Sequence, residues 1–362
     1  MKQKILTFAA MFFIALSVSY GQSEELKLLR QLQAKVNSQD HRYDLLEKKI
    51  DDVLWFHRVG DAAFIDKVYI TSSAPRTNIK NPTAMGVDNP LRFESYVFIP
   101  KNIDVNKKYP LIVLIHGGVH GDFSTYHVHI VRELLAQGYI IVAPEYRGSK
   151  GYGERFWRDI DYGGFEIQDS EAARAYMVEN YSFVDANRVG AVGWSHGGLI
   201  ALMSAMQYPK NYHAVFAGVP VSCLVYRMGY ATDHYLRLFS DDYHIGKTVR
   251  ENIEEYRRRS PTWNAHLLKT PTLITTNTND DDVHYSETMG LINALKANNN
   301  RNFEYRIYQN VPGGHSFDRI DNKQSREARL KVWQFLAKHL KPPTPMRNLK
   351  DMERAAYVVL KP

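Results

Sequence analysis

The chain has 362 residues, of which 44% are hydrophobic and 23% charged, so it carries enough apolar side chains for a sizeable globular core. Its formal net charge is +7, or +5 without Lys2 and Lys4, and the basic residues are interspersed with acids along the whole chain, which argues against nucleic-acid binding. The single cysteine, Cys223, excludes an internal disulfide.

Residues 1–21 have the pattern of a secretory signal peptide. The basic residues Lys2 and Lys4 precede an apolar run over residues 5–18, and small residues follow. The run is shorter than the ~20 residues that a membrane-spanning helix needs. We therefore expect cleavage near Gly21–Gln22, a secreted or periplasmic protein, and no stable membrane insertion after the signal is removed.

Residues 22–85 are predicted to form an N-terminal helical extension. Apolar residues recur at helical spacing between Glu24 and Phe56, which predicts one or two amphipathic helices. The sequence leaves open whether chains associate into a homo-oligomer through these helices.

Residues 86–342 alternate short β-rich runs with helical segments, a pattern typical of an α/β fold with a mainly parallel sheet and helices on both faces. The predicted strands are 93–100, 111–116, 139–146, 188–195, 214–221, 272–278 and 303–309, and the predicted helices are 167–180, 199–207, 286–297 and 325–340. Residues 223–263 interrupt this rhythm and are expected to form a small helical cap over the sheet edge where ligands bind. Residues 343–362 are a C-terminal tail of unassigned role.

The strongest chemical signal is the Gly-Trp-Ser-His-Gly pattern centred on Ser195. It directly follows an apolar strand and directly precedes a helical segment, as in the nucleophile elbow of the α/β-hydrolase fold. Gly193 and Gly197 flank the serine because a side chain would clash in so sharp a turn. We therefore predict an α/β-hydrolase fold with Ser195 as the nucleophile.

A serine nucleophile needs an imidazole to accept its proton and a carboxylate to orient that imidazole. His315 lies in a Gly-rich loop between the last predicted strand and the last predicted helix, where this fold places its histidine. Asp280 and Asp281 follow strand 272–278. We choose Asp280 as the acid, with Asp281 as the main alternative.

Acyl transfer also needs hydrogen-bond donors for the developing oxyanion. The Gly-rich turn after strand 111–116 resembles an HGGG-type oxyanion loop, so the backbone amides of Gly117, Gly118 and His196 are the predicted donors.

Four histidines, His116, His120, His127 and His129, fall within fourteen residues. His-x-His spacing can bind a metal, but no cysteine joins these residues and serine chemistry needs no metal. We expect neither a metal nor a cofactor.

Five motifs in order resemble the catalytic domain of the prolyl oligopeptidase family of serine peptidases, from about Phe93 to Leu340. They are the His-Gly-Gly turn at 116–118, the segments 144–149 and 151–153, the elbow at 193–198, Asp280 with Val283, and Gly314-His315 with Phe317. The resemblance implies that Ser195, Asp280 and His315 take the triad roles. It also implies that the segment containing Arg147 is a structural loop beside the active site, with Arg147 as an ion-pair anchor.

The chain departs from the family pattern in two places. Members usually carry a large N-terminal β-propeller, whereas here about seventy residues precede the hydrolase domain after the signal and look helical. The acid loop reads Thr-Thr-Asn-Thr-Asn-Asp where many relatives have His-Gly before the acid.

The sequence thus predicts a secreted serine peptidase that cleaves short peptides through an acyl-enzyme on Ser195. The alternative is a carboxylesterase acting on small or carbohydrate-linked acyl esters, because the same triad cleaves esters. A third reading, a catalytically silent binding protein on a hydrolase scaffold, is disfavoured because every residue type that the chemistry needs is present in order.

Overall fold

The computed structural model describes residues 2–75 and 89–357, with residues 2–23 described by their helical backbone alone. The strands are β1 (Ala63–Ser72), β2 (Leu91–Pro100), β3 (Tyr109–Ile115), β4 (Ile140–Pro144), β5 (Val184–Trp194), β6 (Ala214–Gly218), β7 (Thr272–Asn277) and β8 (Phe303–Tyr308). The α-helices are α1 (Lys2–Val59), α2 (Val128–Ala136), α3 (Glu154–Arg158), α4 (Phe165–Asn180), α5 (His196–Gln207), α6 (Leu224–Arg227), α7 (Asp233–Ser240), α8 (Ile253–Arg258), α9 (Tyr285–Ala297), α10 (Lys323–Leu340) and α11 (Leu349–Ala356). Short 3₁₀ helices are η1 (Thr125–His127), η2 (Pro261–Leu267) and η3 (Gly314–Arg319).

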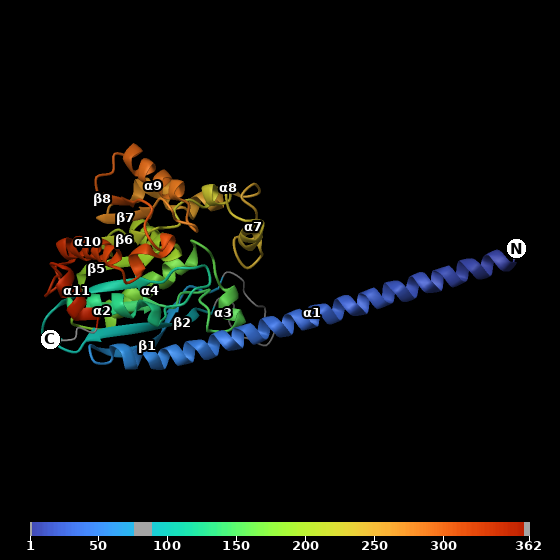
Figure 1. The fold of residues 1–362 in the computed structure, drawn as a ribbon, viewed down its shortest axis with the longest axis horizontal. Helices are drawn as coiled ribbons and strands as arrows, with labels where there is room; N and C mark the ends of the chain where they lie inside the picture. The colour runs from blue at the N-terminus through green and yellow to red at the C-terminus, as the bar shows by residue number, and fades with distance from the viewer. Residues whose placement is uncertain (1, 76–88, 358–362) are drawn as a thin grey trace.

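The strands form one sheet in the order β1-β2-β4-β3-β5-β6-β7-β8 (Figure 1). The β1–β2 and β2–β4 pairs are antiparallel, and all the others are parallel. Strands β4, β6 and β7 are buried along their whole length, as expected where a parallel sheet is covered on both sides. The predicted α/β-hydrolase class with a mainly parallel sheet is confirmed.

Helices cover both faces of the sheet because side chains alternate along each strand. Leu111 and Val113 of β3 join a core that includes buried residues of α4 and α5. Ile112 and Leu114 point the other way and join a second core with residues of α2 and α10. The two cores hold the sheet from both faces, and the predicted site residues lie at the carboxyl ends of its parallel strands.

The region 22–85 is helical only in part. One uninterrupted helix, α1, runs to Val59, and β1 then adds an edge strand that pairs with β2 along ten residues. The prediction of a wholly helical extension is wrong for residues 63–72. Phe64 and Tyr69 are more than half exposed, so β1 lacks the clear apolar and polar alternation that marks a strand.

The predicted signal peptide and the predicted boundary between residues 85 and 86 fall outside the residues whose side chains are described. Among the residues that are described, no helix combines the length and the apolar character needed to cross a membrane.

The two remaining segments are largely helical. The predicted cap at 223–263 contains α6, α7, α8 and the start of η2. The tail contains α11, and its residues Met346 and Met352 are buried in the core beside α2 and α10. Residues 358–362 lie outside the described part. The tail therefore completes the second core.

Candidate active site

Ser195 lies on the sharp turn between β5 and α5. Its φ of 57° and ψ of −122° are rarely adopted by a side-chain-bearing residue. A Cβ on Gly193 would come within 2.2 Å of the Gly197 carbonyl oxygen, and one on Gly197 within 2.4 Å of the Ile115 oxygen. Both glycines are therefore required by close packing, as the motif predicts.

The strained turn is held by backbone hydrogen bonds. The Ser195 amide donates to the Gly218 carbonyl at 2.9 Å, and the Ser195 carbonyl accepts from Val221 at 3.1 Å. The side chain is only 6% exposed. The hydroxyl therefore sits on a rigid platform at the carboxyl end of the parallel strands.

His315 contacts Asp280 directly. Its Nδ1 lies 2.8 Å from Oδ2 and 2.9 Å from Oδ1 of the carboxylate. The same Oδ1 accepts hydrogen bonds from the backbone amides of Asp282 and Val283, at 2.9 and 2.8 Å. The buried carboxylate thus fixes the imidazole from one side, which is the geometry required of a triad acid.

The neighbouring acids do not take this position. Asp281 is exposed, and Asp282 is held by Arg227, whose Nη2 donates to its Oδ1 at 2.8 Å. Asp282 Oδ2 also lies 3.8 Å from His315 Nε2, on the opposite side of the ring. Of the two acids that the sequence leaves open, the geometry favours Asp280.

The loops after β7 and β8 are joined by asparagine side chains. Asn279 donates to the Val311 carbonyl at 2.8 Å and accepts from the Val311 amide at 3.1 Å. The Asn277 amide donates to the carbonyl of Gly314, next to His315. These asparagines occupy the stretch where the chain departs from the family pattern, and sequence reasoning assigned them no role. Their position between a buried strand and the candidate acid is the signal that could have identified them.

The serine turn and the histidine loop are also tied together. The indole nitrogen of Trp194, directly before Ser195, donates to Asp318 Oδ2 at 2.9 Å. Asp318 lies three residues after His315 on η3. The structure therefore brings the segments that carry Ser195, Asp280 and His315 to one edge of the sheet.

The Gly-rich turn at 116–118 lies against the serine. A Cβ on Gly117 would meet the Trp194 carbonyl oxygen at 3.0 Å and the Ser195 Cβ at 3.4 Å. Gly118 has a φ of +78°, which favours glycine. The Tyr146 hydroxyl lies 3.2 Å from the carbonyl oxygens of both His116 and Gly118, which orients the turn.

His196, whose amide is the other predicted oxyanion donor, has a buried side chain. Its Nε2 lies 3.2 Å from Glu166 Oε1, and its ring packs on Tyr162. Burial acts to raise the pKa of the Glu166 carboxyl, but the His196 imidazole, a backbone amide and Arg259 together outweigh this effect, and the pKa is lowered. The contact between His196 and Glu166 anchors the first turn of α5 to α4.

The four clustered histidines point to different partners. His116 Nε2 lies 3.0 Å from the Ser149 hydroxyl, and His120 Nδ1 lies 2.8 Å from the Gly148 carbonyl oxygen. Burial lowers the pKa of His127 to about 3 and that of His129 to about 4, which keeps both neutral. In the described part of the chain, no group of three or more His, Cys, Asp or Glu side chains is arranged to hold a metal ion.

The predicted anchor role of Arg147 agrees with its contacts. The buried guanidinium donates to both carboxylate oxygens of Asp169, at 2.8 and 2.7 Å. The ion pair fixes the loop after β4 to α4, beside the 116–118 turn.

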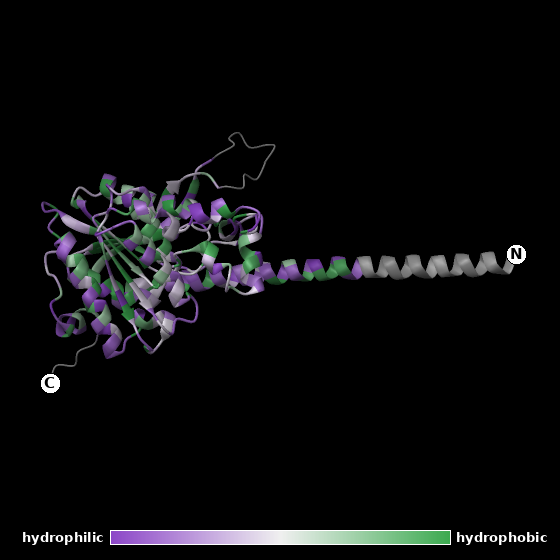
Figure 2. Cartoon of the chain, turned by 90° about the horizontal axis from the view of Figure 1, so that it is seen from above, coloured by the Kyte–Doolittle hydropathy of each residue, from purple (hydrophilic) through white to green (hydrophobic). Residues whose placement is uncertain are grey.

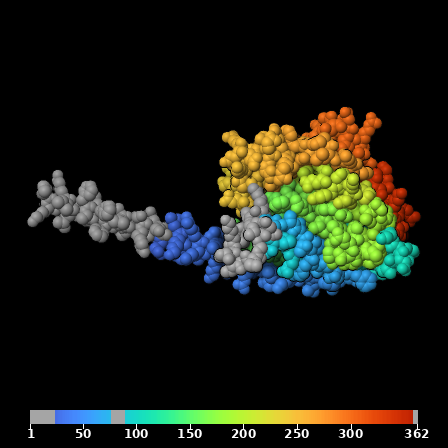
Figure 3. All heavy atoms as spheres, turned by 180° about the vertical axis from the view of Figure 1, so that it is seen from behind, coloured from blue at the N-terminus to red at the C-terminus, as the bar shows by residue number. Residues whose placement is uncertain are grey.

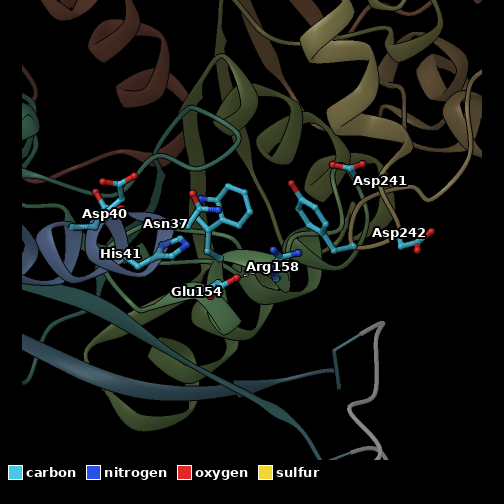
Figure 4. A pocket seen from close by; sticks show the side chains of 10 residues that line it. Asn37, Asp40, His41, Glu154, Arg158, Asp241 and Asp242 are labelled. Atoms are coloured by element: carbon cyan, nitrogen blue, oxygen red, sulfur yellow. Dashed lines mark hydrogen bonds and ion pairs between the residues drawn. The ribbon is translucent and has the colours of Figure 1, made fainter. Parts of the chain in front are cut away.

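A cavity of about 680 Å³ opens where α1, α3 and the segment after α7 meet (Figure 4). Figure 4 shows Asp40 and His41 of α1 on one side and Asp241 and Asp242 on the other. Trp157, which lines this cavity, stacks on His120 with ring centroids 3.7 Å apart. The cavity therefore adjoins the loop that carries the candidate oxyanion donors.

A second cavity, of about 220 Å³, lies beside the acid loop. Arg227, Tyr230 and Tyr235 of the cap region line it together with Asp281 and Asp282. This region thus brings aromatic and charged side chains close to the His315–Asp280 pair.

Comparison with known proteins places these features in a family. The sequence model of the prolyl oligopeptidase family matches residues 125–343, more than half of the chain. The acylamino-acid-releasing enzyme of Mus musculus is 28% identical over 252 residues, covering 67% of this chain and 33% of the relative. Dipeptidyl peptidase 8 of Mus musculus is 30% identical over 177 residues, covering 46% and 20%. The chain spans about a third or less of the length of these relatives.

Solved structures share the fold. The acylaminoacyl peptidase of Pyrococcus horikoshii superposes with a TM-score of 0.62 at 19% identity, covering 80% of this chain and 44% of that one. Dipeptidyl peptidase 4 of Porphyromonas gingivalis gives a TM-score of 0.59 at 23% identity, covering 77% and 36%. From the match over residues 125–343 and the shared architecture, the chain belongs to the prolyl oligopeptidase family of serine peptidases.

Proposed function

We propose that this protein is a serine peptidase that cleaves short peptides through an acyl-enzyme on Ser195. The observation that carries the proposal is the contact of His315 with the buried Asp280 carboxylate. The loop that carries His315 is hydrogen-bonded to Trp194, the residue directly before Ser195. Family membership supports the same reaction class.

In this mechanism the Ser195 hydroxyl attacks the peptide carbonyl carbon while His315 Nε2 takes its proton. Asp280 holds Nδ1–H and stabilises the imidazolium. The amides of Gly117, Gly118 and His196 are the proposed donors to the oxyanion, each such donor contributing about 3 kcal/mol. The intermediate expels the amine, which takes the proton from His315. Water, activated by the same imidazole, then releases the acid and restores the serine.

The direct test is labelling with a fluorophosphonate probe, followed by turnover of peptidyl anilides with free and with blocked N-termini. Wild type should label and cleave at least one anilide series, and Ser195→Ala should do neither. The matched control is Ser316→Ala, which removes a hydroxyl from the histidine loop and should leave labelling intact. A protein that folds but never labels would contradict the nucleophile assignment and favour a silent binding scaffold.

Turnover of esters distinguishes the carboxylesterase alternative from the peptidase proposal. An ester library contains acyl groups on small alcohols and on carbohydrates, which the same triad attacks more easily because the leaving groups are better. Ester turnover with no anilide turnover at any peptide length would replace the peptidase proposal with a carboxylesterase.

We also propose that the protein acts outside the cytoplasm, with cleavage near Gly21–Gln22. The support is the basic, apolar and small-residue order of the first 21 residues. N-terminal sequencing of the extracellular or periplasmic fraction should begin at or near Gln22, and recovery of the full chain in the cytoplasm would refute this.

A further inference from the structure

A stripe of apolar side chains on α1 is exposed to solvent. Each of its members is between 50% and 69% exposed, although each is a large hydrophobic residue: Leu29, Leu32, Val36, Tyr43, Leu46, Ile50 and Val53. Figure 2 shows hydrophobic and hydrophilic residues alternating along this part of the helix. Figure 3 shows the blue part of α1, which begins at residue 24, projecting from the body of the molecule. Single exposed apolar residues are common, but a continuous stripe marks a surface that pairs with something.

The spacing along the stripe is that of a coiled coil. With Gln39 included, successive members are separated alternately by three and four residues from Leu29 to Val53. Written as heptads, position a holds Leu29, Val36, Tyr43 and Ile50, and position d holds Leu32, Gln39, Leu46 and Val53. Val36 and Ile50 at position a, with Leu32 and Leu46 at position d, match the combination that favours two parallel strands, and Gln39 is a single polar residue of the kind that specifies register.

The hydrolase body leaves this seam free because it packs on the other side of the helix. The residues of α1 that contact the body include Lys48 and Trp55 at position f, Asp51 at position b, and Asp52 and Val59 at position c. Positions b, c and f lie opposite the a and d seam. The b, c and f side of the helix is therefore covered by the body, whereas the a and d side is exposed to solvent.

The charged residues at positions e and g, beside the seam, favour one partner and one relative orientation of the two helices. Position g holds Lys35, Arg42 and Lys49, whereas position e holds Asp40 and Glu47. In a parallel pair, each g side chain faces the e side chain five residues later on the other helix. Lys35 would then face Asp40 of a second copy, and Arg42 would face Glu47. An antiparallel pair would place basic g residues against each other.

We propose that α1 forms a parallel, in-register, two-stranded coiled coil with a second copy of this chain, over residues 29–53. The apolar seam and the opposite charges at positions e and g both match a second copy of the same helix, which identifies the partner. Three and a half heptads reach the length at which such a repeat is significant. The proposal does not depend on the enzymatic activity.

Association is tested by light scattering of the purified protein. Wild type should have twice the chain mass at micromolar concentration. The double variant Val36→Asp with Leu46→Asp should be monomeric, with association weakened at least a hundredfold. The matched control, Ala34→Asp with Ser38→Asp, adds the same charge at the exposed positions f and c and should remain dimeric. Both variants should keep fluorophosphonate labelling and the wild-type unfolding temperature, because every changed side chain is exposed. A monomeric wild type, or a dimer that survives the seam substitutions, would overturn the proposal.

Direction is tested by disulfide trapping. The native Cys223 is buried and should contribute little background. Leu32→Cys and Ile50→Cys should each cross-link with itself under mild oxidation, because parallel in-register helices place equal positions side by side. Cross-linking only when the two variants are mixed would show an antiparallel pair and refute the proposed direction.

Discussion

The indole nitrogen of Trp194 and the carboxylate of Asp318 are 2.9 Å apart and fully buried. This hydrogen bond joins the residue before the candidate nucleophile to the short helix that carries the candidate base. Burial raises the pKa of Asp318, although Arg319, the indole and Arg329 act against this shift. The contact couples two loops that lie more than a hundred residues apart.

Removal of this contact should loosen the histidine loop. In Trp194→Phe, Asp318 loses its indole donor inside the core, which should cost about 1–3 kcal/mol of unfolding free energy. The value of kcat/KM should fall as the base moves relative to the serine. Chemical denaturation and steady-state kinetics measure both effects. Asp318→Asn, which keeps an acceptor oxygen for the indole, is the control and should lose less activity; equal losses would indicate that the hydrogen bond has no positioning role.

Asp280→Asn should abolish most activity while the protein stays folded. The amide keeps its acceptor for the backbone donors but stabilises the wrong imidazole tautomer, and such a change lowers kcat about 10⁴-fold in a serine triad. Asp281→Asn changes an adjacent, exposed acid and should leave kcat within a few-fold of wild type. The reverse ranking would make Asp281 the acid.

Asn279→Ala removes both side-chain hydrogen bonds to Val311. The loops after β7 and β8 then lose one link, and small displacements of a catalytic group cost up to about a hundredfold in rate. We expect kcat/KM to fall between about tenfold and a hundredfold. Asn298→Ala removes a single side-chain hydrogen bond, to the Ala294 carbonyl at the exposed end of α9, and serves as the control, since it should leave kcat/KM unchanged.

Gly197→Ala should prevent correct folding of the serine turn. The new methyl group would lie within 2.5 Å of the carbonyl oxygens of Ile115 and His116, so the strand or the helix must move. Gly290→Ala, in the middle of α9 with no atom within 4 Å of the added methyl, should stabilise the protein by about 0.5–1 kcal/mol. Thermal unfolding and probe labelling distinguish the two variants, and a fully labelled Gly197→Ala protein would disprove the packing argument.

The buried Lys48–Glu145 ion pair should make the protein acid-sensitive. Burial acts to raise the pKa of the Glu145 carboxyl, but Lys48 and His116 together outweigh this effect, and the pKa falls from an ordinary 4.5 to about 2. Because the folded-state pKa is depressed, the stabilisation is complete above the unfolded value and is lost as pH falls from about 4.5 towards 2. Lys48→Met should cost about 3–5 kcal/mol at pH 7, since it removes the lysine partner of a buried carboxylate. Denaturation at pH 7 and pH 3 measures this, and the loss caused by the variant should be smaller at pH 3. An equal loss at both values would assign the effect to packing.

The sequence predicts those site residues that lie in a motif of adjacent residues or at a fixed place in the order of strands. Ser195 is recognisable because strand, Gly-rich turn and helix follow one another, and His315 because its loop stands at a fixed point in the strand order. Asn277 and Asn279 are not recognisable in this way, since their hydrogen bonds join loops about thirty residues apart and leave no spacing pattern. The acid could be narrowed to two neighbours by sequence, and only the direction of the side chains separates them.

Helix α2 and strand β1 were also not predicted from the sequence, because both depend on contacts with residues far away along the chain. Helix α2 is short, and His129 in it and His127 before it have a spacing that can also bind a metal. Its buried Glu133 pairs with Arg329, nearly two hundred residues away, which no local pattern can reveal. Strand β1 depends on its pairing with β2 rather than on its own composition.

The ring of Trp55 stacks on Phe123 at 5.2 Å, with the planes only 4° apart, and no part of it reaches solvent. The C-terminal end of the N-terminal helix is therefore part of the hydrophobic core. A recombinant version that begins at β1, without this helix, would leave a hole the size of an indole beside Phe123. Any attempt to produce a minimal enzyme must therefore keep the last turns of that helix.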